Sequence, residues 1–334
     1  MNKLLGQGGY GCVYWPQINC DGTVGSLQFV SKIQKKGRAS ENELNIGKKI
    51  TTIKDFNKHF KVVFSSCNIS IKTVKDSIIN ECDILNKNKD DYLVMKIPYV
   101  KFYNFNDFFD NTNKKLLHIY RTYKYLVKSL ELLDKLNITH LDIKRENIII
   151  DYDYTPIILD FGISINWDEI QLEDYPQIFY IYAPDYYPWC FEIQLINYII
   201  SNKNYEETTE TISYSELQNV CNEYITKSGL FKYFSKDFTE KYKLALYDYV
   251  KRYYNKPLPT VVKELIKTKS TWDMTALAII YFKLIYQFNN VFLNSPFVIK
   301  LLEILLTNFS PYPEKRYSFK KTLQELSNLK QIKN

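Results

Sequence analysis

The sequence predicts an α+β fold in which a smaller, strand-rich N-terminal part precedes a larger helical part. The chain has 334 residues, 46% of them hydrophobic, which suffices for one large domain or two lobes sharing a cleft. Residues 3–14 and 27–33 have the apolar pattern of strands, whereas residues 113–136 and 242–253 carry apolar side chains at helical spacing. This composition excludes a disordered chain.

Glycine is scarce in this chain and is concentrated near the N-terminus. Only 10 residues are glycine, about 3% against an average usage of about 7%. Four of the ten lie within six consecutive positions, namely Gly6, Gly8, Gly9 and Gly11. Where glycine is used so sparingly, such a cluster predicts backbone positions at which any Cβ would be in the way.

The glycine cluster belongs to a longer run with the pattern G-x-G-x-x-G-x-V. The run reads Gly6-Gln7-Gly8-Gly9-Tyr10-Gly11-Cys12-Val13. A dinucleotide-binding fold uses a similar pattern but needs a helix directly after it. Here Trp15 and Pro16 follow, so we expect a second strand and a hairpin whose backbone N–H groups face a phosphate. A flexible hairpin without a ligand is the alternative.

A lysine interrupts the next strand-like run, residues 27–33. Lys32 lies in its middle, and burying an unpaired ammonium group is costly, so its position requires partners. A nucleotide phosphate and a carboxylate would supply them. The following helical stretch, residues 40–50, offers Glu41 and Glu43, of which Glu43 is better placed to face the cleft. The alternative is a surface lysine with solvated glutamates.

A second group of polar residues follows the helical stretch at 113–136. It reads His140-Leu141-Asp142-Ile143-Lys144-Arg145-Glu146-Asn147 and fits H-x-D-x-K-x-x-N. This pattern would occur by chance in roughly one chain of this length in 500. Asp160-Phe161-Gly162 follows a short apolar run at 157–159.

With these residues in this order, the sequence resembles the eukaryotic-type protein kinase family, whose signatures are the glycine-rich loop, the strand lysine, H-x-D-x-K-x-x-N and D-F-G. The resemblance spans residues 4 to about 325. It implies a bilobal protein kinase fold, with a small β-rich N-lobe at residues 1–97 and a larger helical C-lobe at residues 98–334. Phosphoryl transfer needs mainly positioning and charge neutralisation, which such a set of residues supplies.

The resemblance implies a catalytic role for several of these residues. Asp142 would accept the proton of the substrate hydroxyl, and Lys144 would contact the γ-phosphoryl group. Asn147 and Asp160 would hold the metal ion. His140 is expected to be structural, and a plain turn residue is the alternative for Asp142.

Nucleotide binding, by the same resemblance, involves the hairpin, the strand lysine and the segment between the lobes. Lys32 would grip the α- and β-phosphates, held by Glu43. The run at 93–98 resembles the strand leading to the hinge, with Met95 as gatekeeper. The expected ATP-binding residues are Gly6, Gln7, Gly8, Gly9, Tyr10, Gly11, Val13, Lys32, Glu43, Met95 and Ile97. The cofactors implied are ATP and Mg²⁺, with Mn²⁺ as a substitute.

Three further residues resemble structural positions of the family. Tyr182-Ala183-Pro184-Asp185 resembles the A-P-E motif with Asp in place of Glu. Asp273 matches the aspartate that opens the central helix of the C-lobe. Arg316 matches the arginine that pairs with the A-P-E carboxylate, so we expect a buried pair of Asp185 and Arg316.

The sequence departs from the family at several points. Leu141 replaces the Arg that in many kinases receives a phosphorylated activation loop, and Ser164 is the only Ser or Thr at 163–182. We therefore expect activity without phosphorylation of that loop. Ile178 occupies the expected position of a threonine that contacts the catalytic Asp and Lys. The chain starts at its first strand, so no N-terminal regulatory segment is expected.

A long insert, residues 186–270, replaces what is usually a short connection in the family. Apolar spacing predicts helices at 189–200, 213–224, 242–253 and 260–267. The insert would add packing to the C-lobe or, alternatively, offer a docking surface for a substrate or partner. A second, shorter insertion covers residues 72–91.

Composition bounds the location and the partners. The 6 cysteines show no C-x-x-C pairing and the 3 histidines lie far apart, so we expect no zinc site, no disulfide framework and a reducing compartment. The most hydrophobic stretch, 274–288, is interrupted by Lys283, and no signal peptide or membrane span is expected. A net charge of +7 is mild and argues against nucleic-acid binding.

The sequence thus predicts an ATP- and Mg²⁺-dependent serine/threonine protein kinase whose partner is a protein with a Ser or Thr acceptor, because Lys144 is typical of that class. The short N-terminus, the insert and the AT-biased composition resemble kinases of large nucleocytoplasmic DNA viruses, which implies the host cytoplasm and the virion as locations. A pseudokinase scaffold is the first alternative. A small-molecule kinase similar to aminoglycoside phosphotransferases is the second.

Overall fold

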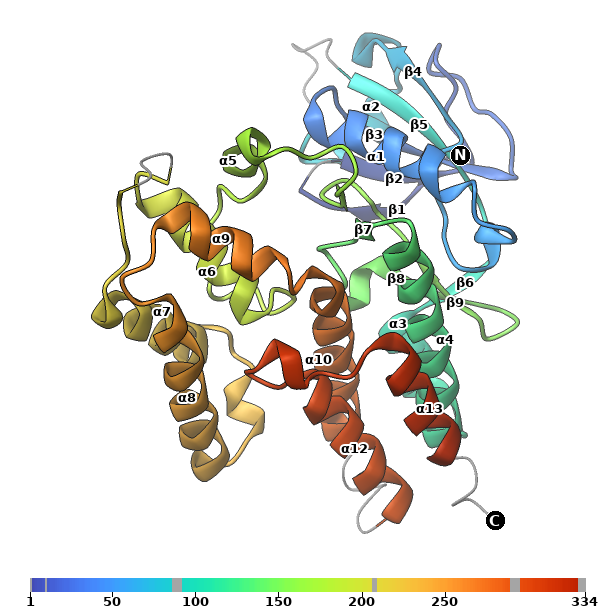
Figure 1. Cartoon of the computed structure of the whole chain (residues 1–334). Helices are drawn as coiled ribbons and strands as arrows, with labels where there is room; N and C mark the ends of the chain where they lie inside the picture. The colour runs from blue at the N-terminus through green and yellow to red at the C-terminus, as the bar shows by residue number, and fades with distance from the viewer. Residues whose placement is uncertain (1, 10, 86–91, 206–208, 289–294, 330–334) are drawn as a thin grey trace. The chain divides into compact units, whose positions relative to one another are not determined.

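A computed structural model describes residues 2–9, 11–85, 92–205, 209–288 and 295–329 of the chain. These residues form two compact units. The first contains residues 1–115 and 145–165, and the second contains residues 116–144 and 166–334. The mixture of strands and helices confirms the predicted α+β content (Figure 1). The assignment of lobes to residues 1–97 and 98–334 stays a prediction.

The first unit is built on a five-stranded antiparallel sheet with the order β1-β2-β3-β5-β4 (Figure 1). Its strands are β1 (Lys3–Gln7), β2 (Gly11–Trp15), β3 (Phe29–Lys35), β4 (Ser65–Ile69) and β5 (Tyr92–Pro98). The expected hairpin at residues 3–14 is therefore confirmed, with β1 and β2 as its arms. No helix follows the glycine run, which excludes the dinucleotide-fold arrangement.

Both faces of this sheet are covered. Helix α1 (Arg38–Ile50) follows Gly37, whose φ of 156° is accessible mainly to glycine, and it contacts β3 through an ion pair of Lys32 with Glu43. The opposite face carries Cys12, Tyr14 and Ile33, which pack against residues 69–85, including η2 (Ile71–Thr73) and α2 (Asp76–Asn80). The predicted insertion at 72–91 thus contributes to the core as far as Leu85, and residues 86–91 lie outside the described part.

The remaining elements of the first unit are short. A three-stranded sheet has the order β6-β8-β9, with β6 (Phe102–Asn104), β8 (Ile148–Asp151) and β9 (Pro156–Ile158). Helix α3 (Phe105–Asn111) and the turns η1 (Phe56–Lys58) and η3 (Arg145–Asn147) complete it. The antiparallel pairing of β8 with β9 brings residues 147 and 159 together, since Leu159 N donates to the carbonyl of Asn147 at 2.9 Å.

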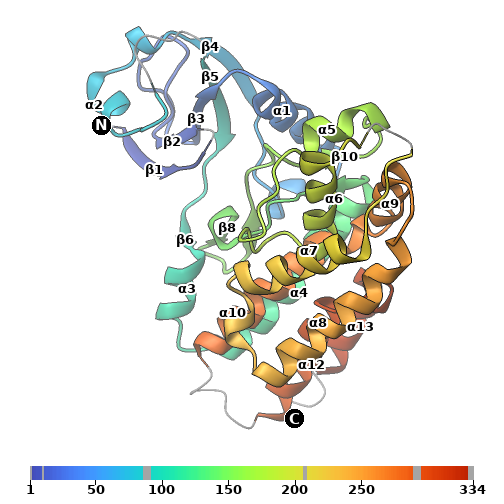
Figure 2. The ribbon, with the colours of Figure 1, turned by 90° about the vertical axis from the view of Figure 1, so that its left-hand side faces the viewer.

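The second unit is mainly helical (Figure 2). Its elements are α4 (Lys115–Lys135), β7 (Ile138–Thr139), β10 (Ile165–Asn166), η4 (Leu172–Asp174), α5 (Tyr175–Ile178), α6 (Phe191–Asn202), α7 (Tyr214–Lys227), η5 (Phe231–Tyr233), α8 (Lys236–Val250), η6 (Lys251–Tyr253), α9 (Leu258–Ile266), η7 (Lys269–Thr271), α10 (Trp272–Gln287), α12 (Pro296–Asn308), η8 (Pro313–Lys315) and α13 (Phe319–Leu329). Helix α10 is apolar around most of its circumference and is buried from Trp272 to Tyr281. Among the described residues no helix combines the length and apolarity that crossing a membrane requires.

The insert forms four helices, α6 to α9, as its sequence predicts, although their ends differ. The predicted helix at 242–253 starts earlier, at Lys236, because Ser235 caps it by accepting a hydrogen bond from Phe238 N. Figure 2 shows α7 beside α8. Tyr242 of α8 is fully enclosed and donates to the Phe309 carbonyl at 3.1 Å, so the insert is part of the core of this unit.

The expected pair of Asp185 and Arg316 is wrong. Arg316 Nη2 lies 2.8 Å from Oε1 of Glu192, and both side chains are at most 2% exposed, whereas Asp185 is exposed. Arg316 also donates to the carbonyl of Ser310 and to Thr271 Oγ1. The buried carboxylate is that of Glu192, which lies seven residues after Asp185, in the first turn of α6. The segment that leads to it is thus longer than the family pattern assumes.

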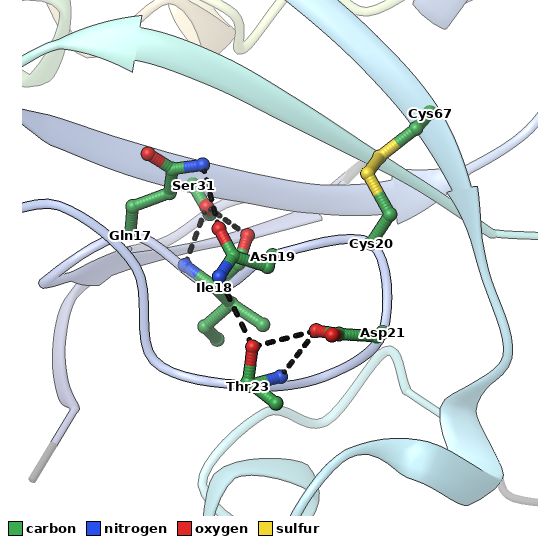
Figure 3. The surroundings of a disulfide bond; sticks show 8 residues. All are labelled: Gln17, Ile18, Asn19, Cys20, Asp21, Thr23, Ser31 and Cys67. Carbon is green, nitrogen blue, oxygen red and sulfur yellow. Dashed lines mark hydrogen bonds between the residues drawn. A yellow bond between two sulfur atoms is a disulfide. The ribbon is translucent and has the colours of Figure 1, made fainter.

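The expectation of unpaired cysteines is also wrong. Cys12 is bonded to Cys82, and Cys20 is bonded to Cys67, as Figure 3 shows for the second bond. These pairs are 70 and 47 residues apart in the chain, so no local spacing could reveal them. The scattered spacing of the cysteines therefore does not support the inference of a reducing compartment, since disulfides are typical of oxidising ones.

The Glu192–Arg316 pair should be essential for the stability of the second unit. We expect Glu192→Gln to lower the free energy of unfolding by about 3 to 5 kcal/mol, because Arg316 would stay buried without its counter-charge. Chemical denaturation measures the loss. As a matched control, Glu314→Gln removes the exposed pair with Arg252, also 2.8 Å apart, and should cost at most about 1 kcal/mol. Equal losses in the two variants would contradict the assignment.

The start of α7 should depend on pH through Glu216. Partial burial raises the pKa of this carboxyl, but hydrogen bonds from Lys203 and Ser213 outweigh burial and lower the pKa to about 2. The charged form is thus stabilised in the folded state, and this contribution is complete above pH 4.5 and lost as the pH falls towards 2. We expect Glu216→Gln to cost about 1 kcal/mol at pH 7. The melting temperatures of Glu216→Gln and the wild type should differ by a constant amount above pH 4.5, and the difference should shrink as the pH falls from 4.5 towards 2. A difference that stays the same over this range would refute the prediction.

Candidate active site

The glycine-rich hairpin leaves open space above its backbone. A Cβ at Gly6, Gly8 or Gly9 would meet no other atom within 4 Å, whereas a Cβ at Gly11 would lie 2.5 Å from the carbonyl oxygen of Ile33. The predicted crowding therefore applies to Gly11 alone. The other three positions fit a backbone that a phosphate can approach closely. Tyr10, also a predicted site residue, lies outside the described residues.

Four predicted site residues share one face of the five-stranded sheet. The strand register places Val13, Lys32 and Met95 opposite one another across β2, β3 and β5. Ile97 lies two residues further along β5 and therefore on the same face. Gln7 differs from them, because its side chain donates to Oδ2 of Asp83 at 2.6 Å.

Lys32 is buried and lies between two carboxylates, of which Glu43 is buried and Asp160 is partly exposed. Its Nζ lies 2.7 Å from Glu43 Oε2 and 2.9 Å from Asp160 Oδ1. Burial lowers the pKa of Lys32, but attraction to the two carboxylates outweighs burial and raises it above 10.5, so the ammonium stays charged. Burial also raises the pKa of Glu43 above 4.5, against the opposing effect of Lys32. Glu41 is exposed, because it lies on the outer face of α1.

Helix α1 also holds the Asp160-Phe161-Gly162 segment through Asn42. The Asn42 amide donates to the carbonyls of Gly162 and Ser164, at 3.1 and 2.7 Å. The Phe161 ring is buried with its edge against Phe60. Asp160 has a φ of 61°, an uncommon conformation for a residue with a Cβ, so these contacts fix its carboxylate beside Lys32.

Asn147 and Asp160 supply oxygen ligands of the kind that Mg²⁺ prefers. Asn147 ends the turn η3 before β8, and Asp160 lies just beyond β9, the strand paired with β8. One amide oxygen and one carboxylate fit Mg²⁺, which usually completes its shell with water and substrate phosphates. Across the described residues no cluster of three or more His, Cys, Asp or Glu could hold a metal by protein ligands alone.

The segment around Asp142, in the second unit, is fixed by Asp273. One Asp273 oxygen accepts His140 N at 2.6 Å, and the other accepts Leu141 N at 2.9 Å. Burial raises the pKa of the Asp273 carboxyl above 3.8, although these bonds oppose the change. Leu141 has a φ of 68°, which is rare for leucine and is held by this bidentate contact. The side chain of Asp142 is therefore presented by a strained, well-anchored turn.

Asp142 contacts both Lys144 and an unforeseen tyrosine. Lys144 Nζ lies 2.9 Å from Asp142 Oδ2, and the Tyr186 hydroxyl donates to Asp142 Oδ1. Lys144 also donates to the Tyr186 hydroxyl at 3.3 Å. The residue that contacts both Asp142 and Lys144 is Tyr186, eight residues after Ile178, and the equivalence of Ile178 with the family's threonine stays a prediction. Ile178 ends α5 instead.

Trp189 anchors this arrangement from the side of the insert. Its indole N–H donates to the Leu141 carbonyl at 2.9 Å, and its ring meets the edge of Tyr186 at a centroid distance of 4.9 Å. The motifs therefore identify Lys32, Glu43 and Asp142 but miss Asn42, Tyr186, Trp189 and Glu192. No sequence spacing predicts these four residues, because each contacts a partner that is distant in sequence.

Comparison with protein-family models and with known proteins gives the same result as the motifs. The model of the protein kinase domain matches residues 1–184, more than half of the chain. "Serine/threonine-protein kinase fused" of Drosophila melanogaster is 22% identical over 166 residues, which cover 50% of this chain and 18% of that protein. The chain thus aligns with less than a fifth of this relative. From the family match, together with the glycine-rich hairpin and the Lys32 cluster, we conclude that the chain belongs to the protein kinase domain family.

Proposed function

We propose that this chain is an ATP-dependent serine/threonine protein kinase that transfers the γ-phosphoryl group to a protein hydroxyl. The observation that carries the proposal is the buried Lys32 ammonium between Glu43 and Asp160, on the sheet face next to the glycine-rich hairpin. A protein would gain little from burying the charges of Lys32 and Glu43 beside the partly exposed carboxylate of Asp160, unless the ammonium serves to bind a polyanion.

Each residue has a defined part in the proposed reaction. Lys32 binds the α- and β-phosphates, and backbone N–H groups of the hairpin face the phosphates. Asn147 and Asp160 would hold Mg²⁺, which when bound neutralises charge on the phosphate oxygens. Asp142 takes the proton of the acceptor hydroxyl as its oxygen bonds to the γ-phosphorus, and ADP departs with the electrons of the broken bond. Lys144 steadies Asp142 and the transferred group.

Serine or threonine is the proposed acceptor because Lys144 follows Asp142 by two residues, as in that class. The name of the Drosophila relative agrees with this choice. ATP with Mg²⁺, or Mn²⁺ in its place, and a protein substrate are therefore the proposed partners.

A nucleotide-binding scaffold without efficient transfer is the second candidate. One observation favours it: both oxygens of Asp142 already have partners, Lys144 and Tyr186. A carboxylate can accept about four hydrogen bonds, however, so room remains for an acceptor hydroxyl. We therefore keep catalysis as the main proposal.

The origin of the chain is proposed from its composition and insert, which are similar to those of kinases of large nucleocytoplasmic DNA viruses. Host or virion proteins would then be substrates, in the host cytoplasm or the virion. Of these two locations, the disulfides favour the virion, because virion surfaces are oxidising whereas the cytoplasm keeps thiols reduced.

Asp142→Asn should strongly reduce the rate of phosphotransfer and leave the affinity for the nucleotide unchanged. We expect a loss of roughly 10²- to 10⁴-fold, because the acceptor proton would have no base to receive it. Radiolabelled ATP with basic, acidic, host and virion proteins measures transfer, and phosphoamino-acid analysis identifies the acceptor. Asp185→Asn, at an exposed carboxylate, is the matched control and should transfer normally. Binding of ATP without transfer by the wild type would favour the scaffold.

Tyr186→Phe distinguishes support of Asp142 from obstruction of it. We expect kcat to fall about tenfold and KM for ATP to stay unchanged, since a hydrogen bond to a charged group contributes about 1.5 kcal/mol. The variant keeps the ring contact with Trp189 and loses only the hydroxyl. An increase in kcat would show instead that Tyr186 blocks the acceptor position.

A further inference from the structure

The glycine-rich hairpin is tied to residues 71–85, here named the strap. Cys12 follows Gly11 directly and is bonded to Cys82 of the strap. The next strap residue, Asp83, accepts from the Gln7 amide at 2.6 Å and donates its backbone N–H to Gln7 Oε1 at 3.2 Å. Both arms of the hairpin are thus attached to two consecutive strap residues.

The strap depends on these attachments for its position. It contains one short 3₁₀ turn and a five-residue helix, which are too short to be stable alone. Its buried side chains pack on the sheet face opposite Lys32: Ile71, Val74, Ile78, Ile79, Cys82 and Leu85. Two tyrosines of the sheet add hydrogen bonds, Tyr14 to the Ile78 carbonyl at 2.7 Å and Tyr92 to the Ile84 carbonyl at 3.2 Å. The disulfide therefore joins two elements that are otherwise held mainly by non-directional apolar contacts.

The tip of the hairpin is held by backbone contacts, namely the pairing of Gln7 with Cys12 and the hydrogen bond from Gly8 N to the Gly11 carbonyl at 3.0 Å. Gly6, Gly8 and Gly9 have no side chains, and a Cβ at these positions would meet nothing. The pairing of β1 with β2 is irregular between Leu4 and Gly6. Such a backbone loses much conformational freedom when it closes on a ligand, so a tether formed beforehand reduces the cost of binding.

We infer that the Cys12–Cys82 disulfide preorganises the glycine-rich hairpin, so that nucleotide affinity depends on oxidation of this pair. The inference rests on the proposed function only in naming ATP as the ligand. Formation of the bond removes one proton and one electron from each thiol. A low-molecular-weight disulfide such as oxidised glutathione accepts them and leaves as two thiols.

Because Cys12 and Cys82 are buried, we expect the disulfide to form while the domain folds and not in the folded protein. Cys12 and Cys82 are 0% and 3% exposed, so a reductant or oxidant reaches them only before folding or during local opening. The domain would therefore acquire full nucleotide affinity where its thiols are oxidised as it folds, and keep it afterwards.

The second disulfide provides a matched control. Cys20–Cys67 joins the loop between β2 and β3 to strand β4, and neither cysteine adjoins the glycine run (Figure 3). Its loop has its own hydrogen bonds, since Asp21 accepts from both the backbone N–H and the hydroxyl of Thr23. Removing this disulfide should affect stability without altering the hairpin.

The test compares Cys82→Ala with Cys67→Ala, each purified after oxidative folding, with free thiols counted by mass spectrometry. Titration calorimetry with ATP and Mg²⁺ measures the dissociation constant, and melting curves confirm that each variant is folded at the assay temperature. We expect Cys82→Ala to weaken binding about fivefold, the lower end of usual coupling between sites. Cys67→Ala should bind like the wild type. Equal affinities in all three proteins, or an equal loss in both variants, would overturn the inference.

Two further measurements keep the inference testable if Cys82→Ala does not fold or the wild type binds no ATP. Asp83→Ala retains the disulfide and the backbone hydrogen bond to Gln7 but removes the carboxylate that accepts from the Gln7 amide, and should bind ATP about twofold more weakly. Hydrogen–deuterium exchange over residues 6–11, without ligand, should be faster in Asp83→Ala and faster still after reduction of the wild type. Failure of ATP binding in the wild type would refute the proposed function, whereas unchanged exchange would refute the tether.

Discussion

The first unit depends on the burial of one ammonium group. Lys32 is accommodated in the sheet only because Glu43 and Asp160 approach it within 3 Å from two different elements. Without either carboxylate, the charge would be uncompensated in an apolar environment. The position of α1 and the left-handed conformation of Asp160 are those that bring the two carboxylates to this charge.

The second unit meets the same requirement with different residues. Asp273, at the start of the buried helix α10, accepts two backbone N–H groups and so fixes the turn that presents Asp142. Glu192 of α6 and Arg316, which precedes α13, neutralise each other in the interior of the unit. In both units, polar contacts of buried or partly buried side chains hold irregular backbone in place, namely the segment after Asp160 and the turn at Leu141. Apolar packing supplies the remaining stability.

Residues close in sequence or defined by motif could be predicted, and those defined by distant contacts could not. The register of a strand and the period of a helix suffice to select Lys32 and Glu43 over Glu41, because both periods are fixed by backbone geometry. The helices of the insert follow from the same periodicity, apart from ends set by caps such as Ser235. The partner of Arg316 depends on how the chain returns after the A-P-E-like segment. The number of residues between Asp185 and α6 is specific to this protein, so alignment by motif selected Asp185 in place of Glu192. The disulfides could not be inferred either, since loops of 47 and 70 residues separate the cysteines and only the folded sheet brings them together.

The hydrogen bonds of Asn42 have a mechanical consequence for the first unit. Because Asn42 and Glu43 are neighbours on α1, the same helix holds the backbone after Asp160 and the ammonium beside it. A rotation of α1 would therefore break both sets of bonds. The ion pair of Lys32 and the path of the loop after Asp160 are therefore coupled through one helix, so that a substitution displacing α1 would disturb both.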